Sequence, residues 1–147
     1  IDSPEDSKRL GIGMVHQHFK LVDVFSAADN IWMGKEKPGL FLKKDRYKQI
    51  EEISQKFGFE LDPEKKVYNM AVSEKQTLEI VKVLYYGAKV IILDEPTAGL
   101  DPASRETVIK IINDYRRETG ATIIVVSHSM EDVANVTTEN AKRMFGL

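Results

Sequence analysis

Short, unbroken apolar runs alternate with longer amphipathic segments along this chain. Residues 90–93 read VIIL and residues 122–126 read TIIVV, and neither run is interrupted by charged residues. Unbroken β-branched runs of this length are typical of parallel strands that helices bury on both faces. Residues 12–16, which read IGMVH, predict a further strand. The pattern therefore predicts an α/β fold in which helices flank a parallel sheet.

Apolar residues at helical spacing predict three longer helices between and after these strands. The first covers residues 43–57. The second opens at a capping box, Ser73-x-x-Gln76, and the third begins at Pro102 and ends before Gly120. Helices that connect parallel strands in this way form right-handed crossovers, which bring the carboxyl ends of the strands to one edge.

Candidate chemistry lies where the predicted strands end. Two adjacent carboxylates, Asp94 and Glu95, follow residues 90–93, and His128 follows the next strand. Open α/β sheets bind ligands at the carboxyl ends of their strands. Asp94 could hold a hydrated Mg²⁺, and Glu95 could take a proton from an attacking water. Taken alone, such a pair also fits a solvated acidic turn.

Composition excludes several classes of protein. The 147 residues fit one domain or one compact piece of a larger domain. There are 21 basic and 23 acidic residues, so the net charge of −2 creates no global field that favours nucleic acid. The chain has no cysteine, which excludes a disulfide framework and is consistent with the cytosol. Its apolar runs reach about half a dozen residues, whereas a membrane-spanning helix needs roughly 20.

Three sets of residues together resemble one family. Residues 93–101, LDEPTAGLD, resemble the Walker B and D-loop segments of an ABC-type ATPase, and Gln17 and His128 resemble its Q-loop glutamine and switch histidine. Residues 11–31, GIGMVHQHFKLVDVFSAADNI, are most similar to importers of nucleosides and simple sugars. The resemblance implies an incomplete P-loop NTPase (RecA-like) sheet with a small ABC-type helical subdomain. In the family's sheet, residues 12–16 flank residues 90–93, which flank residues 122–126.

The same resemblance implies a division of the chain. Residues 1–25 would form the Q-loop region, and residues 26–87 the helical subdomain with the signature segment. Residues 88–136 would carry the Walker B, D-loop and switch region. Residues 137–147 depart from the family pattern, and from Thr138 onward the chain reads as a short terminal helix.

The resemblance also implies a function and a site. The parent protein would hydrolyse ATP with Mg²⁺, using Glu95 as general base, Asp94 and Gln17 to organise Mg²⁺, and His128 to steady charge on the γ-phosphate. Asp101 would act across a head-to-tail dimer with a second ATPase domain. The implied partner is a transmembrane permease, so the protein would be cytoplasmic and peripheral on the inner face of the membrane.

The signature segment departs from the family pattern LSGGQ, which aligns with Met70-Ala71-Val72-Ser73-Glu74. Ala71 lacks the hydroxyl that the family's serine donates to a γ-phosphate, and losing such a bond costs about 1.5–3 kcal/mol. The two glycine positions carry Val72 and Ser73, whose side chains hinder a close approach of phosphate to the backbone. An alternative register, VSEKQ, places Ser73 on the serine but lies two residues closer to Asp94. Ser73 is therefore a candidate phosphate contact.

No P-loop motif, G-x-x-x-x-G-K-[ST], occurs in the chain, because the single Gly-Lys pair, Gly34-Lys35, is followed by Glu36. We expect a fragment, the carboxyl-terminal two-thirds or so of a nucleotide-binding domain, that is inactive alone. The alternative is an ABC-like module that binds no nucleotide and only docks or dimerises.

Overall fold

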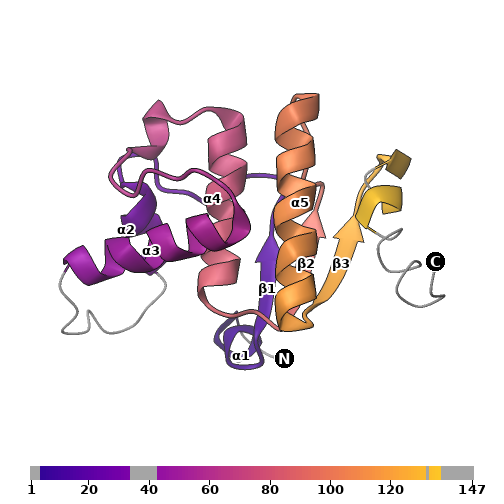
Figure 1. Cartoon of the computed structure of the whole chain (residues 1–147), viewed down its shortest axis with the longest axis horizontal. Coiled ribbons are helices and arrows are strands. Elements are labelled where there is room, and N and C mark those ends of the chain that lie inside the picture. The colour runs from indigo at the N-terminus through magenta and orange to yellow at the C-terminus, as the bar shows by residue number, and fades with distance from the viewer. Residues whose placement is uncertain (1–3, 34–42, 132, 137–147) are drawn as a thin grey trace.

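Three parallel strands form the centre of the fold. The computed structural model describes residues 4–33, 43–131 and 133–136. Within them, β1 (Ile12–Val15), β2 (Val90–Asp94) and β3 (Thr122–Val126) lie side by side in the order β1-β2-β3 (Figure 1). Ile12 pairs with Val90, and Val90 pairs with Thr122. The predicted strands and their order are confirmed.

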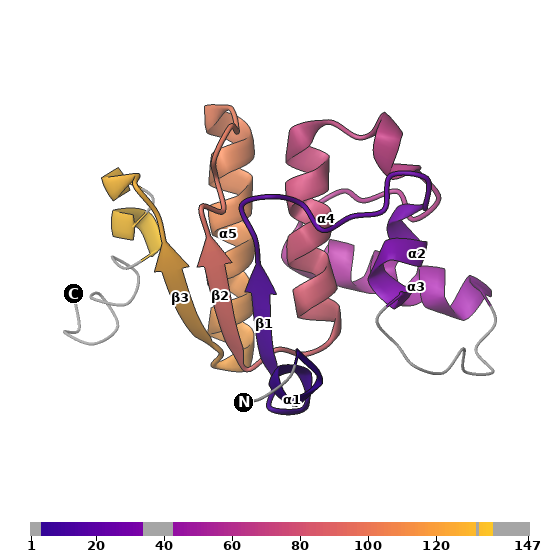
Figure 2. The ribbon, with the colours of Figure 1, turned by 180° about the vertical axis from the view of Figure 1, so that it is seen from behind.

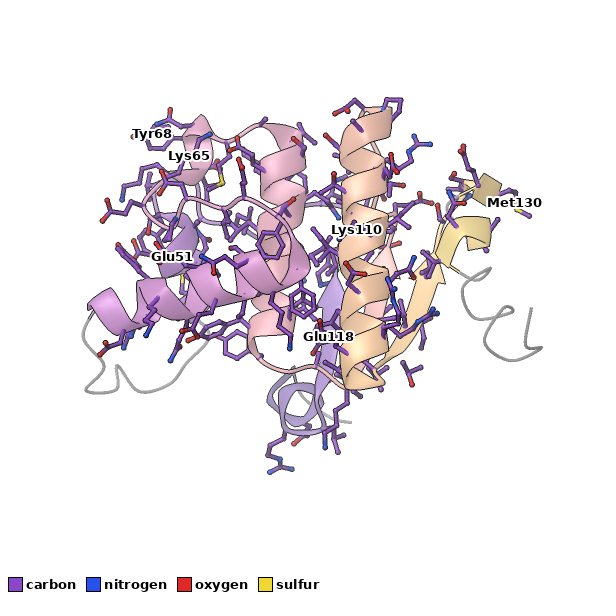
Figure 3. All side chains as sticks on the ribbon, viewed as in Figure 1. Glu51, Lys65, Tyr68, Lys110, Glu118 and Met130 are labelled. Carbon is purple, nitrogen blue, oxygen red and sulfur yellow. The ribbon has the colours of Figure 1, made fainter. Side chains whose placement is uncertain are left out.

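Helices account for the other secondary-structure elements named here. They are α1 (Pro4–Arg9), α2 (Ala27–Trp32), α3 (Lys43–Phe57), the 3₁₀ turn η1 (Val67–Asn69), α4 (Val72–Tyr85) and α5 (Pro102–Thr119). α4 and α5 lie against one face of the sheet, and α2 and α3 lie beyond α4 (Figures 1 and 2). Near the end of α5, Glu118 (Figure 3) forms a 2.6 Å ion pair with Lys56 of α3.

The core lies between the sheet and α4 and α5. Side chains that are in register on neighbouring strands share a face of the sheet. Val15 and Leu93 are in register and have no exposed surface, and they belong to the main apolar cluster. The helices contribute fully or almost fully buried side chains to the same cluster, among them Leu78, Val81, Val108 and Ile111.

The opposite face of the sheet is open in the described residues, as Figure 2 shows. Met14 is 43% exposed and Ile124 is 46% exposed, and both are in register with the half-buried Ile92. The interpretation of residues 90–93 and 122–126 as strands buried on both faces is therefore wrong for this structure. Because both covering helices pack on one side, burial alternates along β2 and β3.

The start of α4 also differs from the prediction. The N-cap is Ala71, so Ser73 lies inside the first turn and does not cap the helix. Glu74 reaches back instead and accepts a 2.8 Å hydrogen bond from the Ala71 amide, and Lys65 donates to the same carboxylate at 2.7 Å. The predicted Ser73-x-x-Gln76 capping box is therefore wrong. In a capping box the residue three positions after the N-cap accepts from the N-cap amide, and Glu74 does this for Ala71.

The ends of α5 agree with the prediction. Asp101 is the N-cap and accepts from the Ser104 amide at 3.0 Å, and Pro102 occupies the first turn. Gly120 ends the helix with a left-handed φ of 71°, a conformation that glycine adopts without the strain of a side chain.

Candidate active site

The predicted site residues gather at one edge of the sheet. Asp94 is the last residue of β2 and Glu95 follows it, while Gln17 lies two residues beyond β1 and His128 two residues beyond β3. Because the strands are parallel and adjacent, their carboxyl ends meet at this edge. The amino ends of α4 and α5 lie at the same edge (Figure 1).

The Glu95 backbone is fixed in an unusual conformation. Its φ is +48°, which makes it the one residue other than glycine with a positive φ among those described. Such a conformation costs about 1–3 kcal/mol for a residue with a bulky side chain. The Glu95 amide donates to the Val126 carbonyl at 2.8 Å, so the turn after β2 remains tied to β3. The strain is maintained by these surroundings, as is common at functional sites.

The Glu95 carboxylate is held by the loop that follows β3. Its Oε1 accepts from the His128 amide at 2.7 Å, and its Oε2 accepts from the Ser127 hydroxyl at 3.2 Å. The His128 imidazole is fully exposed, with Nε2 3.8 Å from Glu95 Oε1. The structure thus brings Glu95 and His128 together, while their catalytic roles stay predictions.

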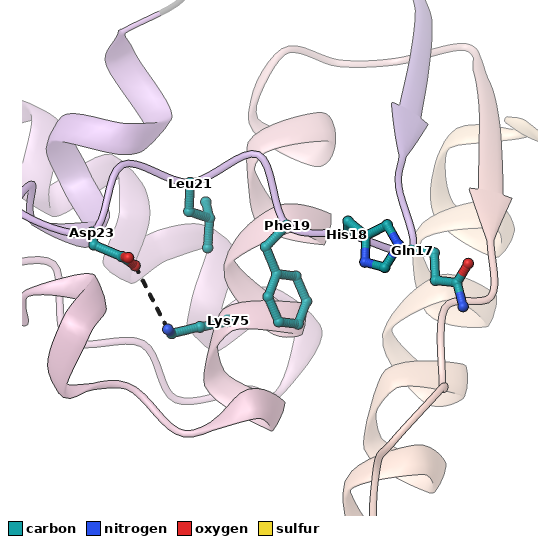
Figure 4. Close-up of a pocket in the computed structure, with 6 residues that line it drawn as sticks. All are labelled: Gln17, His18, Phe19, Leu21, Asp23 and Lys75. Atoms are coloured by element: carbon teal, nitrogen blue, oxygen red, sulfur yellow. Dashed lines mark ion pairs between the residues drawn. The ribbon is translucent and has the colours of Figure 1, made fainter.

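Asp94 and Gln17 provide oxygen atoms that suit Mg²⁺. Magnesium prefers hard oxygen ligands and often binds through one or two carboxylates while it retains several waters. In the part of the chain that the structure describes, no group donates a hydrogen bond to the Asp94 carboxylate, and Gln17, which follows β1 at the same sheet edge, is exposed (Figure 4). The donor set therefore fits Mg²⁺. Within the same ranges, no three His, Cys, Asp or Glu side chains gather as a metal cluster.

Ser73 and Asp101 lie at the starts of α4 and α5. Asp101 caps α5, and its carboxylate accepts from the Ser104 hydroxyl at 2.5 Å. The Ser104 hydroxyl and amide together lower the pKa of Asp101. Ser73 is half-buried in the first turn of α4. Among the described residues, neither Ser73 nor Asp101 forms a hydrogen bond to Glu95, so their predicted contacts with phosphate or a second domain stay predictions.

The structure shows a buried charged residue that sequence reasoning missed. Glu79 of α4 is 3% exposed, and its Oε1 accepts from the Lys20 amide at 2.7 Å. Lys82 lies 3.5 Å from the same carboxylate and also donates to the Lys20 carbonyl at 3.2 Å. The signal in the sequence was an acid and a lysine three residues apart within the apolar stretch LEIVKVL. This cluster ties the segment after Gln17 to α4.

A shallow pocket lies between that segment and α4. It has a volume of about 300 Å³ and is lined by Gln17, His18, Phe19, Leu21, Asp23 and Lys75 (Figure 4). Lys75 and Asp23 form a 3.7 Å ion pair across it. Gln17 thus lies between the pocket and the sheet edge that carries Asp94 and Glu95.

Comparisons with known proteins agree with this geometry. Residues 2–98 match the family model described as ABC transporter. The nucleoside import ATP-binding protein NupA of Lactococcus lactis is 41% identical over 138 residues, which are 92% of this chain and 27% of that protein. The guanosine import ATP-binding protein NupO of Bacillus subtilis is 43% identical over 127 residues, which are 84% of this chain and 24% of that protein. The chain thus spans well under a third of either relative.

Solved structures support the fold. The dimeric structure of the ABC transporter cassette MJ0796 matches with a TM-score of 0.76 and 24% identity, and the match covers 92% of this chain and 60% of that one. The predicted P-loop NTPase-like α/β class is confirmed. Across the described ranges, no helix combines the length and apolar character needed to span a bilayer.

Proposed function

Since the chain belongs to the ABC transporter family, we propose that it provides part of an ATP-hydrolysing site that powers import of nucleosides or simple sugars. One observation carries the proposal: the Glu95 carboxylate is fixed at the carboxyl edge of the sheet, beside His128. The substrate class follows from the relatives, which are named for import of nucleosides, guanosine and, in Clostridium perfringens at 37% identity, galactose and methyl galactoside.

In this proposal each residue at the sheet edge has one task. Glu95 accepts a proton from the water that attacks the γ-phosphoryl group of ATP. Asp94 and Gln17 hold Mg²⁺, which when bound neutralises charge on the phosphate oxygens. His128, whose imidazole is fully exposed, donates to the γ-phosphate. Asp101, at the exposed start of α5, contacts a second ATPase domain in a head-to-tail dimer, and the partner at the membrane is a permease.

ATP binding also requires a P-loop, which these 147 residues do not contain. Backbone amides and the lysine of that loop supply most of the affinity for a triphosphate. We propose that a P-loop strand and helix from outside this sequence pack against β3 and the open face of the sheet. The exposed Ile124 and Val126 are apolar positions that such a segment would cover.

A second candidate function is an ABC-like module that docks or dimerises without binding nucleotide. The observation that favours it is at the start of α4, where Glu74 already occupies the Ala71 amide. The amides of a helix terminus can bind phosphate, and here the cap amide is already taken by a carboxylate. The intact arrangement of Glu95 and His128 favours the enzyme over this module.

The deciding experiment measures Mg²⁺-dependent ATP hydrolysis by the chain joined to an upstream P-loop segment, here termed the P-loop form. Glu95→Gln should lower turnover by about 10²–10⁴-fold, because a general base contributes that much, while ATP binding persists. The 147 residues alone should show no turnover and should not bind Mg·ATP at micromolar concentrations. Turnover of Glu95→Gln within a few-fold of the unmodified P-loop form would exclude Glu95 as the base.

A further inference from the structure

Ser127 lies between the end of β3 and the Glu95 carboxylate, and the mechanism above gives it no role. Its hydroxyl donates to Glu95 Oε2 at 3.2 Å and accepts from the Ser129 amide at 3.0 Å. A hydroxyl has one proton and two acceptor sites. Because the Ser129 amide occupies an acceptor site, the hydroxyl proton remains directed at Glu95.

Two donors together fix the orientation of this carboxylate. The His128 amide holds Oε1 at 2.7 Å, but a single bond would leave the carboxylate able to rotate about that contact. The Ser127 hydroxyl holds the other oxygen and removes this freedom. A carboxylate offers about four lone-pair positions, so two held positions leave others open to a water.

The main chain of Glu95 is also held by the loop that follows β3. The residue is held at a φ of +48° by the 2.8 Å bond from its amide to the Val126 carbonyl. Main chain and side chain of Glu95 therefore both depend on residues 126–128. Among the described residues, Ser127 and His128 are the donors that hold the Glu95 side chain.

We propose that Ser127 is a positioning residue that orients Glu95 to accept the proton of the attacking water. The inference rests on the proposed role of Glu95 as general base. Ser127 itself transfers no proton and forms no covalent bond. Positioning of this kind affects rate strongly, because a displacement of about 1 Å can cost on the order of 10²-fold.

The first test uses the chain itself and follows hydrogen exchange of the His128 amide at single-residue resolution. This amide binds Glu95 and not Ser127. Ser127→Ala should speed its exchange about three- to tenfold, since a hydrogen bond of this kind has a modest net strength. Ser127→Thr keeps the hydroxyl and should retain slow exchange. Ser54→Ala serves as a matched control, because it removes a serine hydroxyl that bonds to the Ile50 carbonyl within α3.

The second test measures ATP hydrolysis in the P-loop form. Ser127→Ala should lower kcat about tenfold with KM for ATP nearly unchanged, because it disturbs the base and not the binding of ATP. Ser127→Thr should restore kcat, and Ser54→Ala should leave it unchanged. In the Glu95→Gln background, Ser127→Ala should have almost no further effect, since the general base that Ser127 orients is already lost.

These outcomes separate the inference from the proposed function. Unchanged His128 exchange in Ser127→Ala, or equally fast exchange in Ser127→Thr, would overturn the positioning role. A further, roughly tenfold loss of kcat when Ser127→Ala is added to Glu95→Gln would also overturn it. If the unmodified P-loop form shows no hydrolysis, the proposed function fails, and the exchange experiment still decides whether Ser127 holds Glu95. Fast exchange of the β2 amides would show that the Ser127→Ala variant unfolds. In that case Ser127→Cys is used instead, because a thiol is similar in size and is a weak hydrogen-bond donor. The exchange rate of the His128 amide should rise in Ser127→Cys as it was expected to rise in Ser127→Ala.

Discussion

Replacing Glu79 by alanine should destabilise the chain by about 3 kcal/mol, because it removes a buried acceptor that two groups share. The Lys20 amide, which donates to Glu79 at 2.7 Å, would be left unpaired, at a cost of about 1–3 kcal/mol. Lys82 would lose an ion pair at 3.5 Å. Its side chain is 21% exposed and also donates to the Lys20 carbonyl, so this loss adds only about 1 kcal/mol.

Glu79→Gln provides the informative comparison. Glutamine keeps an acceptor oxygen for the Lys20 amide and loses only the charge opposite Lys82, so the expected cost is about 1 kcal/mol. Glu106→Ala is the control, because Glu106 is an exposed acid of α5 and its loss should change stability by less than about 0.5 kcal/mol.

The assay is urea denaturation at low protein concentration, followed by circular dichroism. The urea midpoint should be highest for the Glu106→Ala control, lower for Glu79→Gln and lowest for Glu79→Ala. The m-values should be similar if all variants expose the same surface area on unfolding. Equal destabilisation by the two Glu79 variants would show that charge, and not the bond to Lys20, stabilises this contact. A loss below about 1 kcal/mol in Glu79→Ala would refute the assignment of Glu79 as a buried link to the Gln17 segment.

Two further predictions concern the start of α4. In the P-loop form, Ala71→Ser should raise turnover or dimer affinity, because it returns a γ-phosphate donor; a silent Ala71→Ser together with a damaging Ser73→Ala would instead favour the alternative register. The bonds from Lys65 and the Ala71 amide lower the pKa of Glu74 below its ordinary value of 4.5. Glu74 therefore contributes stability that is present above the unfolded pKa and is lost as pH falls through the lower folded pKa. Urea midpoints should show the native chain more stable than Glu74→Gln at pH 7, with the difference shrinking well below pH 4.5; a difference that does not change with pH would contradict this reasoning.

Local patterns were sufficient to predict the strands and the longer helices. The helix predicted from Pro102 to before Gly120 buries Val108, Ile111 and Tyr115 at helical spacing, and Gly120 ends α5 with the backbone that glycine permits. The common edge of Glu95 and His128 followed from the parallel direction of neighbouring strands, which brings their carboxyl ends to one edge of the sheet. These features depend on neighbours in sequence or on chain topology.

The features that sequence reasoning missed depend on contacts between distant segments. The prediction that β2 is buried on both faces required helices on both sides of the sheet. The described helices α4 and α5 instead cover the same face. The cap of α4 depends on Lys65, which binds Glu74 from outside the helix. The contact of Ser127 with Glu95 joins two segments 32 residues apart, and nothing in the letters LDEP indicates the positive φ of Glu95.

The proposed general base, Glu95, and a degenerate signature can belong to the same working protein. In the proposed head-to-tail dimer, the ATP that lies beside Glu95 of one domain faces the start of α4 in the other domain. The Glu74 cap at the start of α4 would therefore weaken the ATP site that contains the base of the second domain. The ATP site that contains Glu95 depends instead on the signature segment of the second domain. The arrangement at Ala71 thus does not argue against catalysis at Glu95.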